Sequence, residues 1–581
     1  MWSGESYDPA RRGAVASLVK KRKKGHDYWY VVESRRVNGR PRIVWQQYLG
    51  TADSIAARAR QTTPGPVTVA EFGAVAALWA LGDRLDLVGL IDRVVPKRDQ
   101  GVSIGHYLVL AALNRVVAPT SKAQIGAWYA KTWLRAHWGI PASAFTSQAF
   151  WRAMDAVDAD ALAAIEDTVA EATVRRFGIR VQTVAYDAPN FFTDIATPTP
   201  GELAQRGHNK QKRNDLRQVN LALLSTVEGH VPLLHTTYPG DVPDPTAFGQ
   251  ALARLNTRYT QLATLTDDRI TVVFDKGNVS QANMTQVWEH AWSVVSTLVP
   301  SHHKDLLAIP RTAYTPVDPA RWPDLLAYTE DRLVYGHPGR VVVTYNPALW
   351  EGQIRGFRHQ QLKMEARIRT LQERLARWRA DPPPRGRRPT PATVDAHLRR
   401  VGRGREPGPF LRWQCTTDAA GVLTLTTHWE EAALAAYQEA HFGKTLLFTD
   451  HTDWAAAAMI AAYRGQGSLE NGFRQMKDPH FVTFSPMFHW TDQKIRVHAA
   501  YCVLALLLAS LLHREARAAG FAGGLDALLE TLTDLKLVVD LPVPGRRTTV
   551  VRLTERTPVQ EQLVQHFHLA QYHAALAPTE G

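Results

Sequence analysis

The stretch Ile270-Thr271-Val272-Val273-Phe274-Asp275 is a short apolar run that stops at a carboxylate. Five consecutive apolar or β-branched residues are typical of a buried strand, and the run is too short for a buried helix. A second stretch, Val181-Gln182-Thr183-Val184-Ala185-Tyr186-Asp187, alternates loosely between apolar and polar residues and also ends in an aspartate. The sequence therefore predicts two strands that each end in a carboxylate.

Further strands and helices are expected around these two aspartates. Two apolar stretches separated by Glu228-Gly229 should pair as an antiparallel hairpin, because this dipeptide lies at the place of a tight turn. These stretches are Val219 to Ser225 and Val231 to Tyr238. The apolar pattern also predicts helices over residues 246–258 and Val279 to His290, and a strand from Trp292 to Val299. This order of strands and helices indicates a mixed α/β domain.

The composition describes a large, basic, globular chain. Its 581 residues are 45% hydrophobic, which suits three or four compact units at roughly 100–200 residues each. The net charge of +13 and the pI of about 9.6 favour a polyanionic partner, nucleic acid first and an acidic membrane surface second. The two cysteines, Cys415 and Cys502, exclude a disulfide scaffold and fit a reducing compartment. The N-terminus shows no secretory signal, and the most apolar run, Ala499 to Leu512, is too short to span a bilayer.

Changes in composition and periodicity divide the chain into six predicted segments. Thr62 to Pro66 has the composition of a linker, and apolar residues from Met364 to Trp378 recur at helical spacing. The segments are a basic N-terminal hairpin module (1–60), a helical region expected to bind DNA (68–178), the first part of an α/β core (180–299), a β-rich insertion with an amphipathic helix (300–453), the second part of the core (454–520) and a C-terminal region (521–581).

The insertion contributes strands of its own. Leu333 to Tyr335 and Val341 to Val343 flank Gly336-His337-Pro338-Gly339, which predicts a hairpin. The other expected elements are strands at Val422 to Thr427 and Thr445 to Phe448, and helices from Trp454 past Lys477 and from Asp492 to Ala519. For the strongly apolar stretch from Asp492 to Arg517 the pattern favours core packing over an oligomer contact.

The N-terminal region combines basic and aromatic residues. Tyr28 to Arg36 and Arg42 to Tyr48 are expected strands joined at Asn38-Gly39, a strong hairpin signal because both turn residues tolerate positive φ. The hairpin and the run from Lys20 to Lys24 place cations near Trp29. Two interpretations stay open: a DNA-contacting module, and a solvated hairpin with a basic tail.

A third carboxylate is expected from the helix that follows the insertion. Polar side chains recur there every three or four residues, which places them on one helical face. They are Tyr463, Gln466, Glu470, Arg474 and Lys477. Such a face offers a metal ligand, Glu470, flanked by phosphate-binding groups. Gly465 and Gly467 weaken this helix by roughly 1 kcal/mol each relative to alanine; they indicate close approach of DNA or of the sheet, or else a helix that begins later.

Asp187, Asp275 and Glu470 are the candidate catalytic and metal-binding residues. Mg²⁺ prefers octahedral oxygen coordination by one or two carboxylates, water and substrate phosphate. Two Mg²⁺ or Mn²⁺ ions roughly 3.5–4 Å apart can activate an attacking oxygen and stabilise a leaving one. Each residue also has a structural interpretation, since an aspartate at a strand end often forms a turn and a helical glutamate often makes surface ion pairs.

Three stretches around these acids resemble the DDE transposases of bacterial insertion sequences. They are Tyr186 to Phe192, Val272 to Asn278 and Tyr463 to Lys477. The resemblance covers roughly residues 180–515, and it is closest to the subgroup with a β-rich insertion before the glutamate. It implies an RNase H-like mixed-sheet core, interrupted by that insertion.

The third stretch matches the subgroup's signature except at one position. The signature is Tyr, two residues, Arg, three residues, Glu, six residues, Lys. This chain keeps Tyr463, Glu470 and Lys477 at that spacing, but Gln466 replaces the arginine. The phosphate contact of that arginine would then fall to Arg464 or Arg474.

The resemblance implies a DNA transposase that cleaves transposon ends and joins the freed 3′ hydroxyl to the opposite strand or to target DNA. Its partners would be terminal inverted repeats, target DNA and further copies of the chain, with a cytoplasmic, DNA-associated location and no membrane. Lys210, Lys212 and Arg213 are candidate contacts to the DNA backbone, with a solvated loop as the alternative. The competing functions are an RNase H-like DNA nuclease without strand transfer and a DNA-binding protein that has lost catalysis.

Overall fold

A computed structural model gives the fold of the chain in two compact units. Unit 1 comprises Met1–Ala80, Ala127–Ala142 and Ala519–Gly581, and unit 2 comprises Leu81–Gly126 and Ser143–Ala518. The structure describes residues 16–37, 40–61, 67–96, 101–195, 200–209, 211–243, 246, 248–250, 252–254, 256–257, 269–381, 388–403, 406–419, 423–477, 483–540 and 550–574, without the side chains of 16, 35–37, 57–61, 468–477 and 573–574.

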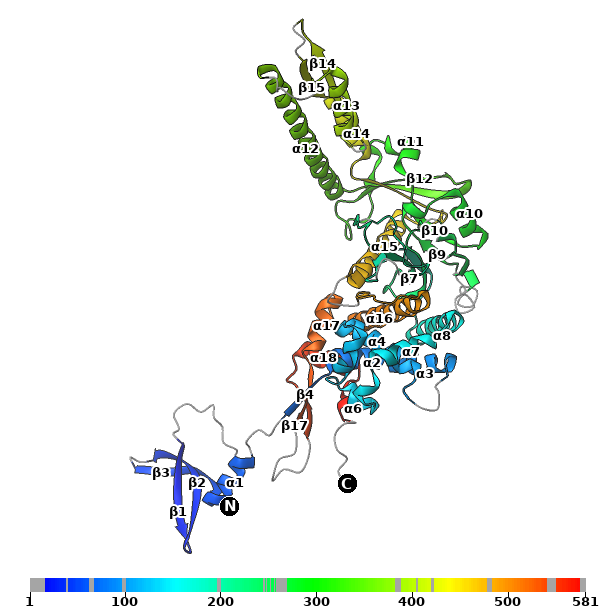
Figure 1. The fold of residues 1–581 in the computed structure, drawn as a ribbon. Helices are drawn as coiled ribbons and strands as arrows, with labels where there is room; N and C mark the ends of the chain where they lie inside the picture. The colour runs from blue at the N-terminus through cyan, green and yellow to red at the C-terminus, as the bar shows by residue number, and fades with distance from the viewer. Residues whose placement is uncertain are drawn as a thin grey trace. The chain divides into compact units, whose positions relative to one another are not determined.

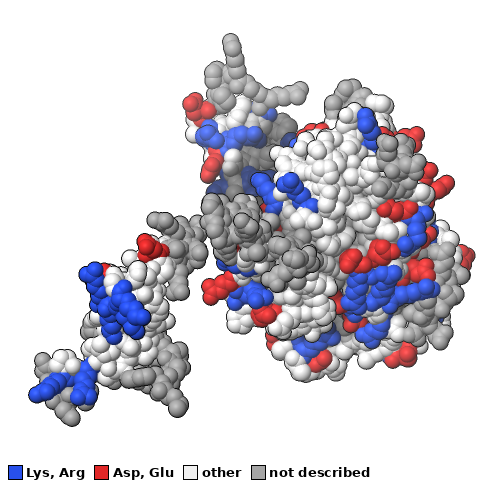
Figure 2. All heavy atoms as spheres, turned by 90° about the horizontal axis from the view of Figure 1, so that it is seen from below, with Lys and Arg blue, Asp and Glu red and all other residues white. Residues whose placement is uncertain are grey.

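The N-terminal part of unit 1 is a three-stranded antiparallel sheet, followed by α1 (Ala52–Gln61). Its strands are β1 (Ala16–Lys23), β2 (His26–Val37) and β3 (Arg40–Gly50). The predicted pair is confirmed, but the run from Lys20 onward is a strand and not a tail. Lys24 and Gly25 both have positive φ, as a two-residue turn between β1 and β2 requires. Figure 2 shows the cations gathered on this sheet. The predicted turn at Asn38-Gly39 lies outside the described residues.

The rest of unit 1 joins chain segments that are far apart in the sequence. A second antiparallel sheet has the order β18-β17-β4, from β4 (Val67–Glu71), β17 (Lys536–Asp540) and β18 (Val550–Leu553). The Trp133 ring lies 5.6 Å from Phe72 and 5.2 Å from Tyr572 between ring centres. The short helices of this unit are α6 (Leu134–Trp138), α17 (Leu525–Thr533), α18 (Pro558–His566) and α19 (Ala570–Ala574).

The helices predicted between residues 68 and 178 are present. They are α2 (Gly73–Arg84), α3 (Leu87–Val94), α4 (Ile104–Val117), α5 (Lys122–Tyr129), α7 (Ser147–Asp155) and α8 (Ala159–Phe177). In unit 2, α4, α7 and α8 begin at Ser103, Thr146 and Asp158, each of which accepts a hydrogen bond from a backbone N–H of the first turn. These helices pack against α16 (Asp492–Ala518).

Helix α16 is a core helix of unit 2. By length and composition it could cross a membrane, but 83% of its most apolar 18-residue window is buried inside the protein. Burial of that window against other helices is the behaviour of a core element. The structure therefore bears out the core packing expected for this stretch.

Unit 2 is built around a ten-stranded mixed sheet (Figure 1). Its order is β11-β12-β13-β16-β10-β9-β5-β7-β6, with β8 paired to β7. The strands of the predicted core are β5 (Thr183–Asp187), β6 (Asn190–Phe192), β7 (Gln218–Thr226), β8 (Pro232–Pro239), β9 (Thr271–Val273) and β10 (Ser293–Thr297). β7 and β8 form the expected hairpin, and β9 is parallel to both β5 and β10. α10 (Gln281–Glu289) connects β9 to β10, which confirms a mixed α/β fold.

Residues 300–453 extend this sheet and also form a module of their own. β11 (Thr315–Pro316), β12 (Leu326–Val334), β13 (His337–Tyr345) and β16 (Lys444–Thr449) continue the sheet beyond β10. The β12–β13 turn consists of Tyr335 and Gly336. It begins one residue before the predicted four-residue turn and is two residues shorter. The elements between β13 and β16 are α12 (Pro347–Ala380), α13 (Pro391–Gly402), β14 (Leu411–Thr417), β15 (Leu423–Trp429) and α14 (Glu431–His441). The predicted amphipathic seam of α12 is buried against α13, β14 and β15.

A buried polar cluster joins α5 to α16. Lys122 contacts the Tyr501 hydroxyl, and His489 Nε2 lies 3.2 Å from His498 Nδ1. His498 Nε2 lies 2.7 Å from the Phe484 carbonyl, which can only accept, so this nitrogen carries the proton of a neutral ring. Burial, and then Lys122, lower the pKa of both histidines, that of His489 to about 2. Both imidazoles are therefore neutral in the folded protein.

These pKa shifts predict that the free energy of unfolding falls as pH drops below about 6.5. In the unfolded chain each histidine takes up a proton near that pH. Because the unfolded state then binds more protons, stability falls by up to about 1.4 kcal/mol per pH unit and per histidine. Urea unfolding at several pH values between about 7.5 and about 5.5 measures the slope. His489→Gln should flatten it and the exposed-site control His359→Gln should not; an unchanged slope in His489→Gln would contradict the assignment.

Candidate functional site

Asp187 and Asp275 lie side by side at the carboxyl ends of adjacent parallel strands. The last paired residues of β5 and β9 are Ala185 and Val273, and each aspartate follows two residues later. Adjacent strands are about 4.8 Å apart, and residues in register point to the same face of a sheet. The two carboxylates therefore emerge together from one edge of the sheet.

Both carboxylates are held in the same local geometry. Asp187 Oδ1 accepts a hydrogen bond from the Ala188 N–H at 2.8 Å, and Asp275 Oδ1 accepts one from the Lys276 N–H at 2.7 Å. Asp187 is half-buried and Asp275 is exposed. Each side chain is thus fixed by its own backbone at the end of a buried strand, as a rigid metal ligand requires.

Helix α15 (Ala456–Lys477) crosses the sheet beside these two residues. Its first turns, at Met459 and Ile460, pack on the part of the sheet formed by β13 and β16. Further along, the Tyr463 hydroxyl lies 3.4 Å from Asp275 Oδ1, and Gln466 Nε2 lies 3.4 Å from the Tyr186 carbonyl. The helix therefore passes β16 and β9 and then reaches β5 at the residue before Asp187.

Glu470 lies on the same face of α15, one turn after Gln466. At 1.5 Å per residue its backbone is about 6 Å further along the helix axis. Its side chain lies outside the described part of the structure, and so do those of Arg474 and Lys477. The described side chains include no group of three His, Cys, Asp or Glu residues suited to a metal. The predicted set of three includes Glu470, whose side chain is not among those described.

Gly465 lies where α15 passes close to the end of β7. A Cβ atom there would lie 2.2 Å from Cγ1 of Val227, which follows β7. A Cβ atom at Gly467 would meet nothing within 4 Å. Since α15 begins at Ala456, before both glycines, a later start of the helix is excluded. Close approach of the sheet explains Gly465 but leaves Gly467 without a structural reason.

Gln466 and Arg464 occupy places that the sequence did not indicate. Gln466 is 6% exposed and bonded to the β5 backbone, so it positions the helix, which argues against the phosphate contact predicted for it. The Arg464 guanidinium carbon lies 5.1 Å from the ring centre of Trp322, and that of Arg321 lies 4.6 Å from the same ring. Trp322 comes from the insertion, and no pattern in the sequence links it to α15.

The predicted basic track before β7 is only partly free of ion pairs. Arg213 is bound to Asp215 through two nitrogen–oxygen contacts of 2.9 and 2.8 Å, which lower the pKa of Asp215 to about 2. Lys212 is exposed, with no ion pair among the residues that the structure describes. Lys210 lies outside those residues. Lys212 is therefore the member of the predicted track that the structure leaves available to a phosphate.

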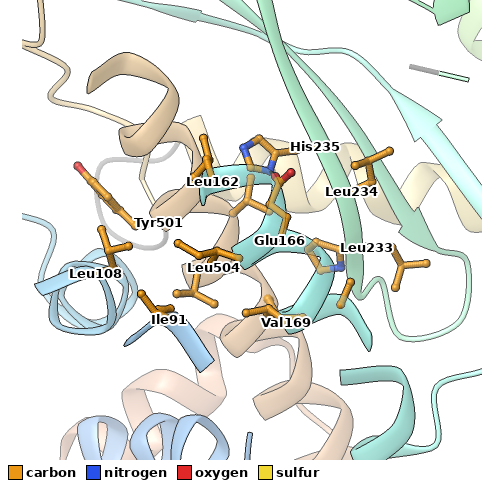
Figure 3. Close-up of a pocket in the computed structure, with 16 residues that line it drawn as sticks. Ile91, Leu108, Leu162, Glu166, Val169, Leu233, Leu234, His235, Tyr501 and Leu504 are labelled. Carbon is orange, nitrogen blue, oxygen red and sulfur yellow. Dashed lines mark ion pairs between the residues drawn. The ribbon is translucent and has the colours of Figure 1, made fainter. Parts of the chain in front are cut away.

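A separate pocket of unit 2, partly open to solvent, is mostly apolar (Figure 3). It has a volume of about 60 Å³, and an ion pair between Glu166 and His235 lies among its lining residues. Most of its lining consists of leucine, isoleucine and valine side chains, and neither Asp187 nor Asp275 contributes to it. Such a cavity does not suit phosphodiester chemistry, because a phosphate would lose its hydration there without gaining polar partners.

Comparisons with known proteins add little to this geometry. No protein-family model matches the chain, and no curated protein matches it. Among solved structures, it is similar to the piggyBac transposase in a synaptic complex with hairpin DNA. The two chains are 7% identical over 87% of this chain and 85% of the other, with a TM-score of 0.36. A likeness at that level does not establish a shared fold.

The close approach at Gly465 predicts opposite effects of alanine at the two glycines of α15. Gly467→Ala should raise the free energy of unfolding by up to about 1 kcal/mol, because it improves helix propensity in open space. Gly465→Ala should lower it by about 1–3 kcal/mol, because the new methyl group must displace Val227. Chemical denaturation of both variants measures the difference, and Val227→Ala should partly rescue Gly465→Ala. Equal stabilisation by both alanines would contradict the observed packing.

Proposed function

We propose that this chain is a DDE-type DNA transposase whose catalytic acids are Asp187, Asp275 and Glu470. The observation that carries the proposal is the register between β5 and β9, which brings two aspartates 88 residues apart in the sequence to one edge of the sheet. The helix that carries Glu470 reaches the same edge, next to Asp187. Carboxylates from two strands and one helix would thus meet at a single place.

The order of the strands supports an RNase H-like core. Around β5 the order is β8-β7-β5-β9-β10, antiparallel on the side of β7 and parallel on the side of β9. An RNase H-like core would place its first acid on the central strand and its second on the parallel neighbour. Asp187 on β5 and Asp275 after β9 stand at those two places.

The donor set at this edge fits Mg²⁺ or Mn²⁺. Asp187 and Asp275 offer hard carboxylate oxygens held at fixed strand ends, and exposure of Asp275 leaves access for water and substrate. These cations prefer such oxygen ligands to nitrogen or sulfur. We propose two ions held by Asp187, Asp275 and Glu470; when bound they would supply charge neutralisation at the attacking and leaving oxygens.

The remaining residues of the site would orient the acids and the DNA. The Tyr463 hydroxyl contacts Asp275, and Gln466 ties α15 to β5, so both fix the helix that carries Glu470. Backbone phosphates would be bound by the single ammonium groups of Lys212 and Lys477 and by paired N–H groups of the Arg474 guanidinium. The proposed substrates are the element's terminal inverted repeats and target DNA, and the proposed active form is a homo-oligomer on DNA in the cytoplasm.

Substitution of the acids should separate cleavage from binding. Asp187→Asn, Asp275→Asn and Glu470→Gln should each reduce metal-dependent strand cleavage by roughly 10²-fold or more, the scale on which active-site electrostatic groups act. Binding of the same DNA should change little, because none of the three supplies a positive charge. The substrate is a fragment carrying the DNA that flanks the gene, assayed with and without Mg²⁺.

The control variant is Asp305→Asn, which removes an exposed carboxylate paired with Arg332 in the same unit. It should cleave at the rate of the unmodified protein. Cleavage that persists in any of the three acid variants would remove that residue from the proposed set. Pre-cut ends then test strand transfer, and cleavage without joining would leave a nuclease in place of a transposase.

A further inference from the structure

The segment from α12 to β15 carries a large surplus of positive charge. Residues Pro347–Trp429, called here the basic module, contain sixteen Lys or Arg and seven Asp or Glu. Their net charge is +9, whereas the whole chain carries +13. This surplus of positive charge, in about a seventh of the chain, favours a polyanionic partner.

The basic module has its own hydrophobic core, which fixes where the charges point. Six side chains of α12 are buried, and four of them pack with α13, β14 and β15. These four are Met364, Ile368, Leu371 and Leu375. In the chain, β13 precedes the module and α14 and β16 follow it. Figure 1 shows α12, α13, β14 and β15 lying together. The cations of α12 are therefore carried on a packed scaffold and not on a loose loop.

Three cations form a stripe on the exposed side of α12. Lys363, Arg367 and Arg374 are exposed and separated by four and seven residues, which places them on one helical face. The stripe spans about 17 Å at 1.5 Å per residue, a length that covers about five phosphates of one DNA strand. None of the three forms an ion pair among the residues that the structure describes.

Some other cations of the module are already paired with acidic residues, unlike those of the stripe. Arg355 pairs with Glu351 at 3.6 Å and Arg399 with Asp395 at 2.7 Å. The stripe keeps its charge although acidic residues occur elsewhere on the same helix. Surface cations without local partners are the groups that can release counterions on binding a polyanion.

A second basic surface on α13 adjoins the stripe. A hollow of about 750 Å³ is lined by Arg400 and Arg403, by Arg399 in its pair with Asp395, and by Trp413. His397 of α13 lies near cations of both surfaces: partial burial, and then Arg374 and Arg400, lower its pKa.

The surface of the module suits a nucleic acid better than an acidic protein. Of its described large apolar side chains, only Leu349 and Leu362 are exposed. A protein interface would need a contiguous apolar centre, which two separated leucines do not provide. A DNA backbone needs only regularly spaced positive charge.

We propose that the basic module binds the phosphate backbone of duplex DNA through the stripe of Lys363, Arg367 and Arg374. This surface is separate from the three acids, and its role rests on the proposed function as a DNA transposase. It would hold DNA without reading its sequence, because backbone contacts position a duplex but do not specify it.

Full-length protein with Lys363→Gln, Arg367→Gln and Arg374→Gln tests this role. Its affinity for a labelled random-sequence duplex, measured by fluorescence anisotropy over a range of salt concentrations, should show a salt slope lower by about 2–3, since each lost phosphate contact removes about 0.9. Affinity at low salt should fall by about tenfold or more. The matched control is Arg152→Gln, Lys304→Gln and Arg517→Gln, which removes equal charge from exposed residues elsewhere in unit 2 and should keep the slope.

The outcomes separate this proposal from the proposed function. If the unmodified protein binds DNA and the stripe variant has the slope and affinity of the control, the basic module is not a DNA-binding surface. If polyglutamate competes as well as duplex DNA at equal charge, an acidic polypeptide is the better partner. If the unmodified protein binds no DNA at any salt concentration, the transposase proposal itself is overturned. Circular dichroism checks that the variants are folded.

Discussion

The parallel register of β5 and β9 is the constraint on which the site depends. A slip of one residue along either strand would turn one aspartate to the opposite face of the sheet. Both strands are buried between neighbours, with β7 on one side and β10 on the other, and every residue of β7 is buried. Burial on both faces specifies the register strongly, so the position of the two carboxylates follows from packing of the whole sheet and not from local turns.

The insertion contributes to the site through the sheet. Its last strand, β16, pairs antiparallel with β10 and leads into α15, which then passes β9 and β5. A helix that follows β16, a strand separated from β9 by β10 alone, thus brings to the site residues that lie almost 200 positions after Asp275. The path is possible because Gly465 has no side chain where the helix passes Val227. The basic module is inserted in the chain between β13 and β16, two neighbouring strands of this sheet.

Sequence patterns predicted the elements whose apolar residues are local and buried. The strands ending at Asp187 and Asp275, the β7–β8 hairpin and the seam of α12 all belong to this class. The strand through Lys20 was missed, because a charged, exposed strand has no apolar alternation. The pairing of β4 with β17 was missed because the partners lie over 460 residues apart. At the site, the motif spacing indicated the acids, whereas the buried role of Gln466 depends on an atom of β5 that no pattern in α15 reveals.

The central claim is that three acids hold the same cations, and a crystal structure of the protein with Mn²⁺ and bound DNA tests it most directly. Anomalous scattering would locate each metal independently of the protein atoms. The account predicts density within about 2.0–2.2 Å of carboxylate oxygens from Asp187, Asp275 and Glu470, as hard divalent cations require. Metal bound elsewhere, or a Glu470 carboxylate that remains remote from the two aspartates in the DNA complex, would contradict it.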